Sequence, residues 1–159
     1  MKPFFVSYVA ALATLAVLDA LWLGLVSREF YKARLGQLLL DRPLWSVAIL
    51  FYLIHAAGIA VFAVPPAIAA GTWTAAVLYG ALFGFCVYAA YDITNLATLR
   101  GWPMAVSLVD LTWGAAATAA SNLVASSSCG QFRRPDCGRR RTPDGGARNR
   151  PRSCTRARS

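Results

Sequence analysis

Charged residues are scarce in this chain of 159 residues: only 14% are Asp, Glu, Lys or Arg, against about 25% in an ordinary soluble domain. The few charges are also unevenly spread. Residues 1–128 carry six Lys or Arg and five Asp or Glu, a net charge of +1, whereas residues 129–159 carry ten Arg and two Asp, a net charge of +8. The overall charge of +9 therefore belongs to the end of the chain and does not make this a basic protein throughout.

The sequence also lacks the patterns that mark most catalytic and metal sites. It has one histidine, and none of its four cysteines stands in a Cys-x-x-Cys or similar metal-binding spacing. The nucleophile elbow Gly-x-Ser-x-Gly and the glycine loop that cradles phosphates are missing as well. We therefore predict no disulfide framework, no metal and no cofactor. Whether the protein is an enzyme stays open, with the absences weighing against it.

Long apolar segments fill most of the remaining sequence. A membrane-spanning helix needs about 20 mostly apolar residues, and four segments meet this requirement, at about 4–26, 44–64, 72–96 and 104–125. Four soluble core helices of this composition would leave no polar face to meet water. We predict an all-α, polytopic membrane protein whose four transmembrane helices form an antiparallel bundle over residues 1–126, with the lipid bilayer as its main partner.

Tryptophan, proline and glycine mark the expected ends of these segments. Pro65-Pro66 is expected to stop the second segment, Gly71 to form the turn after it, and Pro103 to open the fourth. An aromatic belt places tryptophan at both membrane interfaces. Four tryptophans fall near such positions: Trp22, Trp45, Trp73 and Trp102.

The basic residues of the connecting loops predict an orientation. The first loop (27–43) and the third loop, around Arg100, lie on one side and together hold five basic residues: Arg28, Lys32, Arg34, Arg42 and Arg100. The other side, without the end of the chain, holds only Lys2. The positive-inside rule places the two loops in the cytoplasm and both termini outside, in a bacterial inner membrane.

Residues 127–159 conflict with that orientation, because their ten Arg would lie outside. Two explanations stay open. The segment is either a cytoplasmic anchor for anionic lipid in an inverted topology, or an aberrant end derived from a frameshift. We favour the second, because this mixture of Arg, Pro, Gly, Ser and Cys is typical of a GC-rich gene read out of frame. Either way we expect disorder, and we expect no nucleic-acid binding, since Phe132 is the only aromatic residue there.

Polar residues lie inside the apolar segments, at positions where an alanine would carry no free-energy cost of insertion into the membrane. Asp19, Asp92 and Asp110 belong to three different segments, and all lie roughly 6–12 Å from the face of the first and third loops at the helical rise per residue. An aspartate at the centre of a transmembrane helix costs about 2.5–3.5 kcal/mol. We therefore expect the three carboxylates to face the bundle interior as a candidate polar cluster, with Asn95 at the same exit and His55 slightly deeper.

Aromatic residues are the expected supports of this cluster. Trp22 follows Asp19 by three residues, and Trp113 follows Asp110 by three, so each indole shares a helix face with a carboxylate. An indole N–H donated to the carboxylate of its own helix would satisfy both groups. Tyr88 stands four residues before the third acid, on the same stripe.

Two interpretations of the polar cluster stay open: interhelical hydrogen bonding without chemistry, or a polar chamber open to the cytoplasmic side. Gly80 and Gly84 form a Gly-x-x-x-Gly pair that permits close helix approach. We predict a proton- or cation-coupled transport component, which would form a homo-oligomer if one copy leaves no room for a path. The alternatives are a membrane-embedded lipid-modifying enzyme and a non-catalytic accessory protein.

Four stretches taken together resemble a known family. They are LDALWLGLVSREFYKARLG, FYLIHAAGIAVFAVPPA, GALFGFCVYAAYDITNLATLRGWP and VDLTWGA, and they resemble the bacterial membrane proteins grouped as domain of unknown function 2177. The resemblance covers about residues 1–124. It implies a four-helix inner-membrane protein, and it implies no activity and no catalytic residues. Members continue the fourth helix with apolar residues, whereas this chain has SSSCGQFRRPD.

Overall fold

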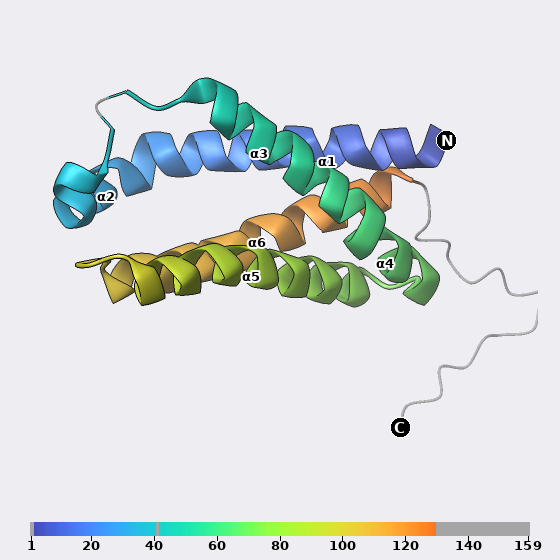
Figure 1. The fold of residues 1–159 in the computed structure, drawn as a ribbon. Coiled ribbons are helices and arrows are strands. Elements are labelled where there is room, and N and C mark those ends of the chain that lie inside the picture. The colour runs from blue at the N-terminus through green and yellow to red at the C-terminus, as the bar shows by residue number, and fades with distance from the viewer. Residues whose placement is uncertain (1, 41, 130–159) are drawn as a thin grey trace, which may run out of the picture.

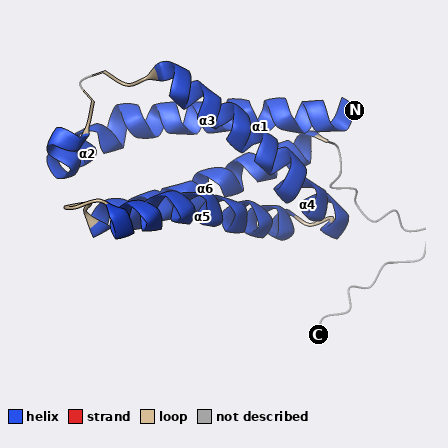
Figure 2. Ribbon diagram, in the orientation of Figure 1, coloured by secondary structure: helices blue, strands red, loops and turns tan. Residues whose placement is uncertain are grey.

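The computed structural model describes residues 2–40 and 42–129, and within these residues helices are the only regular secondary structure (Figure 2). The chain runs back and forth along one axis (Figure 1). The first pass is α1 (Lys2–Leu21), which continues through the π-helical turn η1 (Trp22–Ser27) into the short helix α2 (Arg28–Leu35) and a 3-10 turn, η2 (Gly36–Leu38).

The second pass is also one helical run with a change of winding inside it. It consists of α3 (Trp45–Gly58), the π-helical turn η3 (Ile59–Ala63) and α4 (Val64–Ala70). The last two passes are α5 (Trp73–Thr98) and α6 (Met104–Ser128), which lie side by side and antiparallel (Figure 1). The part of the predicted tail beyond residue 129 lies outside the described residues.

Both ends of the described chain lie at the same end of the bundle. The Cys129 thiol donates a weak hydrogen bond to the carbonyl oxygen of Pro3 (3.3 Å). Gly71, with a φ of 66°, makes the turn between α4 and α5 at that end. The opposite end holds α2 and the turn between α5 and α6 (Figure 1), so the described chain makes four antiparallel passes.

Three helical runs of the described residues are long and apolar enough to cross a membrane: Pro3–Leu25, Trp45–Ala70 and Trp73–Thr98. The α6 helix has the length, but its mean hydropathy is too low to count among them. It packs along both α1 and α5, and its interior positions are mostly Ala, Ser, Thr and Gly. A helix enclosed by its neighbours needs few large lipid-facing side chains, which accounts for the lower hydropathy. The expected count of four apolar spans is therefore not confirmed.

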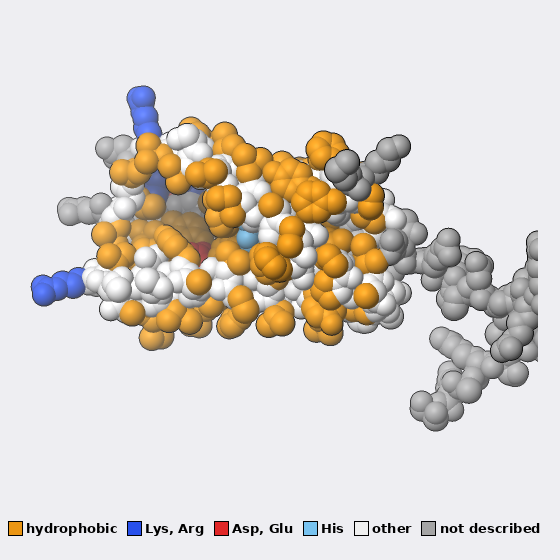
Figure 3. Space-filling model, turned by 45° about the vertical axis from the view of Figure 1, so that its right-hand side comes forward, with side chains coloured by type: hydrophobic (Ala, Val, Ile, Leu, Met, Phe, Trp, Pro, Cys, Tyr) orange, Lys and Arg blue, Asp and Glu red, His pale blue; other side chains and the backbone are white. Residues whose placement is uncertain are grey.

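The distribution of side chains is the reverse of that in a soluble protein. Large apolar side chains such as Phe5, Ile54 and Leu82 are more than half exposed, and apolar side chains cover much of the surface in Figure 3. The interior is built from small residues and holds many polar ones. The buried polar side chains of the described residues are Ser7, Asp19, His55, Asp92, Ser107, Thr118, Ser121, Asn122 and Ser126. Such an outside fits lipid, and it is too apolar for water.

Glycines bring α5 and α6 into close contact, as the Gly-x-x-x-Gly pair predicts. A Cβ atom at Gly80 would lie 2.7 Å from Cβ of Asn122, and one at Gly84 would lie 2.6 Å from Cβ of Thr118. Both distances are shorter than any real contact between carbon atoms. The two helices therefore pack backbone against backbone, the arrangement that small residues permit within membranes.

The prediction that Pro65-Pro66 stops the second segment is wrong. The two prolines occupy the first turn of α4, just after η3, and the helix continues to Ala70. Proline is tolerated in a first turn because its missing N–H would have no partner there. The first loop contains a helix, α2, with Glu29 in its first turn and Lys32 and Arg34 in its last, as the helix dipole favours.

A carboxylate and aromatic pocket at the basic end

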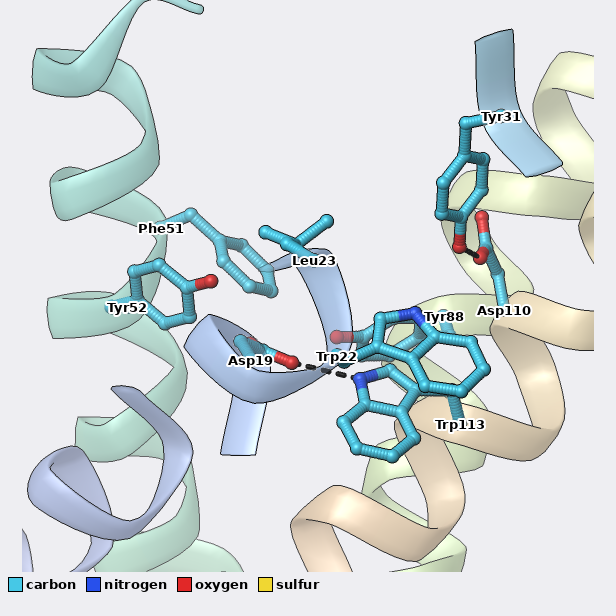
Figure 4. Close-up of a pocket in the computed structure, with 9 residues that line it drawn as sticks. All are labelled: Asp19, Trp22, Leu23, Tyr31, Phe51, Tyr52, Tyr88, Asp110 and Trp113. Atoms are coloured by element: carbon cyan, nitrogen blue, oxygen red, sulfur yellow. Dashed lines mark hydrogen bonds between the residues drawn. The ribbon is translucent and has the colours of Figure 1, made fainter. Parts of the chain in front are cut away.

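A pocket of about 160 Å³ lies between the helices near the end of the bundle that holds α2 (Figure 4). Two carboxylates line it, Asp19 from α1 and Asp110 from α6. Three phenols line it as well, Tyr31 from α2, Tyr52 from α3 and Tyr88 from α5. Five separate helices thus contribute polar groups to one small cavity.

Two stacked indoles form one wall of the pocket. The rings of Trp22 and Trp113 lie 4.3 Å apart between centroids and only 10° from parallel. Trp22 and Leu23 stand on the π-helical turn η1, and Phe51 from α3 completes the apolar part of the lining. The pocket therefore combines carboxylates with exposed aromatic faces.

Asp19 is held by a neighbouring helix. Its side chain is 6% exposed, and Nε1 of Trp113 donates a hydrogen bond to Oδ1 (2.7 Å). The Tyr52 hydroxyl also points toward this carboxylate (Figure 4). The i, i+3 spacing suggested a pair between Trp113 and Asp110, but the Trp113 indole bonds to Asp19 of α1 instead. Because α1 and α6 run antiparallel, Trp113 lies opposite Asp19, and Trp22 stacks on Trp113.

Asp110 is held by α2. The Tyr31 hydroxyl donates a hydrogen bond to its Oδ1, and the indole of Trp22 lies beside the same hydroxyl. Burial raises the pKa of the Tyr31 phenol above its usual value, and the hydrogen bond to Asp110 raises that pKa further. This contact ties α2 to α6 and closes one side of the pocket.

Replacing Tyr31 by phenylalanine is expected to make the thermal stability of the protein less dependent on pH under alkaline conditions. In the unfolded chain a phenol has a pKa of about 10, and in the folded protein the pKa of Tyr31 is higher. The protonated phenol therefore contributes its full stabilisation only at pH values below about 10. The stabilisation is lost as the pH rises through the folded pKa. Wild-type protein in detergent should therefore lose thermal stability more steeply than Tyr31→Phe between pH ~9 and ~12. Parallel curves for the two proteins would show that the Tyr31 phenol does not titrate with unfolding.

Asp92 lies outside the pocket, buried between α5 and α6. Its side chain is fully buried, and neither of its oxygens has a hydrogen-bond partner among the described residues. Ser107 of α6 lies close enough to interact with this carboxylate, and its hydroxyl accepts a hydrogen bond from Nε1 of Trp102 (2.9 Å). Asp92 is near enough to Asp110 for the two charges to interact.

His55 and Asn95 also lie outside the pocket. The His55 ring is buried, stacks between Phe51 and Phe83 at centroid distances of 5.3 and 5.7 Å, and shares a hydrogen bond with Oγ1 of Thr118 (3.0 Å). Its contacts are those of a packing histidine. Asn95 lies beside the Tyr91 hydroxyl on α5, away from the pocket.

The predicted cluster is thus divided. Of the candidate residues, the pocket brings together Asp19, Asp110, Trp22, Tyr88 and Trp113. Sequence reasoning missed four residues that line the same pocket, Leu23, Tyr31, Phe51 and Tyr52. The spacing of Tyr52 and His55, three residues apart, could have indicated a shared inward face. Nothing in the first loop indicated that Tyr31 reaches the interior.

Positive charge stays outside the pocket. Within residues 2–40 and 42–129, no Lys or Arg side chain lines it, and neither Asp19 nor Asp110 has an ion pair. The described part of the chain also has no group of three or more His, Cys, Asp or Glu side chains that could hold a metal ion. The basic side chains gather instead at the surface of the same end of the bundle (Figure 3).

The fold, the apolar outside and the buried carboxylates define a polytopic α-helical membrane protein. The chain belongs to the family described as predicted membrane protein (DUF2177), whose family model matches residues 4–127. This match confirms the resemblance noted in the sequence, and the family is one of unknown function. Searches of curated proteins and of solved structures gave no match.

Proposed function

We propose that this protein is the cation-binding component of a proton- or cation-coupled transport process in the bacterial inner membrane, with Asp19 and Asp110 as the binding carboxylates. One observation carries the proposal: two carboxylates from different helices line a single small pocket, and no Lys or Arg side chain of the described residues lines it with them.

Electrostatics favour a cation or protons in this pocket. Charges in a medium of low dielectric constant interact far more strongly than in water, and a buried carboxylate without a counter-charge is costly. The hydrogen bonds from Trp113 and Tyr31 offset part of that cost. A bound cation would offset the remainder, and the faces of two indoles and three phenols would attract it through their ring quadrupoles.

The location of the pocket fits access from the cytoplasmic side. It lies at the end of the bundle where Arg28, Lys32, Arg34 and Arg100 lie, and the positive-inside rule assigns that end to the cytoplasm. In this proposal α6 crosses the membrane as a fourth span, because it runs the length of α5 and returns the chain to the end that holds the N-terminus.

The π-helical turns supply a means of rearrangement. Short π-helical segments within α-helices are frequent at functional sites. η1 carries Trp22 and Leu23 of the pocket, and η3 interrupts the second pass next to the helix that bears Phe51 and Tyr52. A shift of either turn would change the width of the pocket, as a transport cycle requires.

Proteoliposomes test the proposal. Vesicles that contain a trapped pH-sensitive dye and purified protein are exposed to an inward gradient of tetramethylammonium, K⁺ or Na⁺. The wild type is expected to move protons in response to at least one of these gradients, and Asp19→Asn and Asp110→Asn are expected to reduce the response to that of empty vesicles. The carboxamide keeps the shape of the side chain and an oxygen that can accept the Trp113 or Tyr31 hydrogen bond, and it removes the charge.

Asp92→Asn is the matched control, because it makes the same change in a buried aspartate outside the pocket. It should retain most of the wild-type response. A wild type that behaves like empty vesicles with every cation would contradict a transport role, and it would leave the accessory-protein interpretation standing. If Asp19→Asn, Asp110→Asn and Asp92→Asn reduced the proton response equally, the response would not depend specifically on the two carboxylates of the pocket.

A further inference from the structure

A second, larger cavity adjoins the carboxylate pocket. It has a volume of about 250 Å³ and is lined by Phe51 of α3 and by Val87, Tyr88 and Tyr91 of α5. Its lining is almost wholly apolar. Phe51 and Tyr88 line both cavities, so the two spaces share a wall made of only two side chains.

This second cavity lies at a lateral opening of the bundle. The backbone of α3 packs closely on α1, whereas its continuation, η3 and α4, packs closely on α5; α3 itself touches α5 through ring contacts such as that of His55 with Phe83. The two helices therefore diverge toward the basic end, as Figure 1 shows. Phe51 is 40% and Tyr91 58% exposed at the edges of the opening. Figure 3 shows a hollow in this part of the surface, with an acidic side chain visible inside it and a histidine side chain beside it. With the bundle in a membrane, this opening would face lipid, and the carboxylate pocket would lie behind the shared residues Phe51 and Tyr88.

We propose that the two cavities together bind an amphiphilic organic cation, a substituted ammonium ion with one alkyl chain of medium length. This inference rests on the cation site proposed above and names its ligand class. The ammonium group lies between Asp19 and Asp110 against the stacked indoles, and the alkyl chain lies in the apolar cavity between Phe51 and Val87. The ligand enters sideways from the membrane, in which it dissolves.

Among the described residues, no Lys or Arg lines either cavity, and this distinguishes the proposed ligand from a phospholipid headgroup. In a zwitterionic phospholipid, a phosphate stands between the amine and the hydrocarbon chains. Such a phosphate would lie among carboxylates and phenols with no positive charge to pair with it, which is unfavourable in a medium of low dielectric constant. A free amine or quaternary ammonium amphiphile carries no such group.

Binding measurements in nanodiscs test the inference with three probes: tetramethylammonium, decyltrimethylammonium and decanol. Tryptophan fluorescence reports binding, because Trp22 and Trp113 form the wall of the pocket. Val87→Phe fills the apolar cavity, and Tyr91→Ala removes part of its edge. Leu82→Phe is the matched control, since Leu82 is 61% exposed on the same helix and lines neither cavity. Partition into the bilayer is the same for every variant, so the comparison between variants isolates the cavity.

The expected result is a change in relative affinity. The ratio of the affinities for decyltrimethylammonium and tetramethylammonium should fall about tenfold in Val87→Phe and in Tyr91→Ala, a difference of about 1.4 kcal/mol. It should be unchanged in Leu82→Phe. Asp19→Asn and Asp110→Asn should weaken the binding of both cations, and decanol should bind none of the proteins specifically.

Three results would overturn the inference. An unchanged ratio in both cavity variants, with tetramethylammonium still bound, would show that the alkyl chain does not use the cavity while the cation site stands. Decanol binding as tightly as decyltrimethylammonium would show that the carboxylates do not recognise the charge. Failure of both cations to bind the wild type would remove the cation site as well, and with it the proposed function.

Discussion

Gly84→Leu is expected to destabilise the bundle by about 3 kcal/mol or more, the upper range for overpacking. A Cβ atom at Gly84 would meet the backbone oxygen of Gly114 and the side chain of Thr118, which lies 2.6 Å away. The backbone oxygen belongs to a helix that cannot yield locally, so α5 and α6 would have to separate. The midpoint of unfolding in a denaturing detergent series measures the loss.

Gly24→Leu is the matched control for this prediction. It introduces the same side chain, but a Cβ atom at Gly24 would meet nothing within 4 Å. Its stability should stay close to that of the wild type. Equal stabilities for Gly84→Leu and the wild type would mean that α5 and α6 do not approach each other as described.

Asn122→Leu is expected to cost about 2 kcal/mol or more of stability. The Asn122 amide is fully buried and donates to the carbonyl oxygen of Ala76 on α5 (2.7 Å) and to that of Ala63 at the end of η3 (3.5 Å). Interhelical hydrogen bonds in membrane proteins each contribute about 0.6–2 kcal/mol. The shorter bond, to Ala76, should account for most of the loss.

Asn95→Leu makes the same chemical change on α5, where Asn95 donates no bond to a neighbouring helix among the described contacts. Thermal unfolding in detergent should separate the two variants, with only Asn122→Leu shifted downward. A larger shift for Asn95→Leu than for Asn122→Leu would contradict the role of Asn122 as the link between α6, α5 and η3.

The membrane class and the helix positions follow from the sequence because length and hydropathy determine them directly. A run of about 20 apolar residues has few structural alternatives, and Gly80 and Gly84 indicate a tight helix contact by their spacing alone. The same reasoning brings Asp19 and Asp110 to the interior, since an ionised side chain is costly against lipid. These inferences need no knowledge of which helices are neighbours.

The composition of the pocket could not be derived in this way, because it depends on helix order, rotation and register. The Trp113 indole donates its hydrogen bond to Asp19 and not to Asp110. This pairing depends on the antiparallel register of α1 and α6, which the sequence does not show. Asp92 shares the stripe of Tyr88, yet it is buried against α6 while Tyr88 reaches the pocket. Tyr31 enters from a segment that looked like a loop, and its contact with Asp110 is a product of tertiary folding.

The indole N–H NMR spectrum of isotope-labelled protein in nanodiscs tests the central claim most directly, that Asp19 and Asp110 bind a cation against the stacked indoles. The chain has five tryptophans, which Trp→Phe variants assign one by one. On titration with tetramethylammonium, the signals of Trp22 and Trp113 should shift while those of Trp45 and Trp73 stay in place, and the shifts should vanish in Asp19→Asn with Asp110→Asn. Signals of Trp22 and Trp113 that do not move, or that move no more than those of Trp45 and Trp73, would contradict the account.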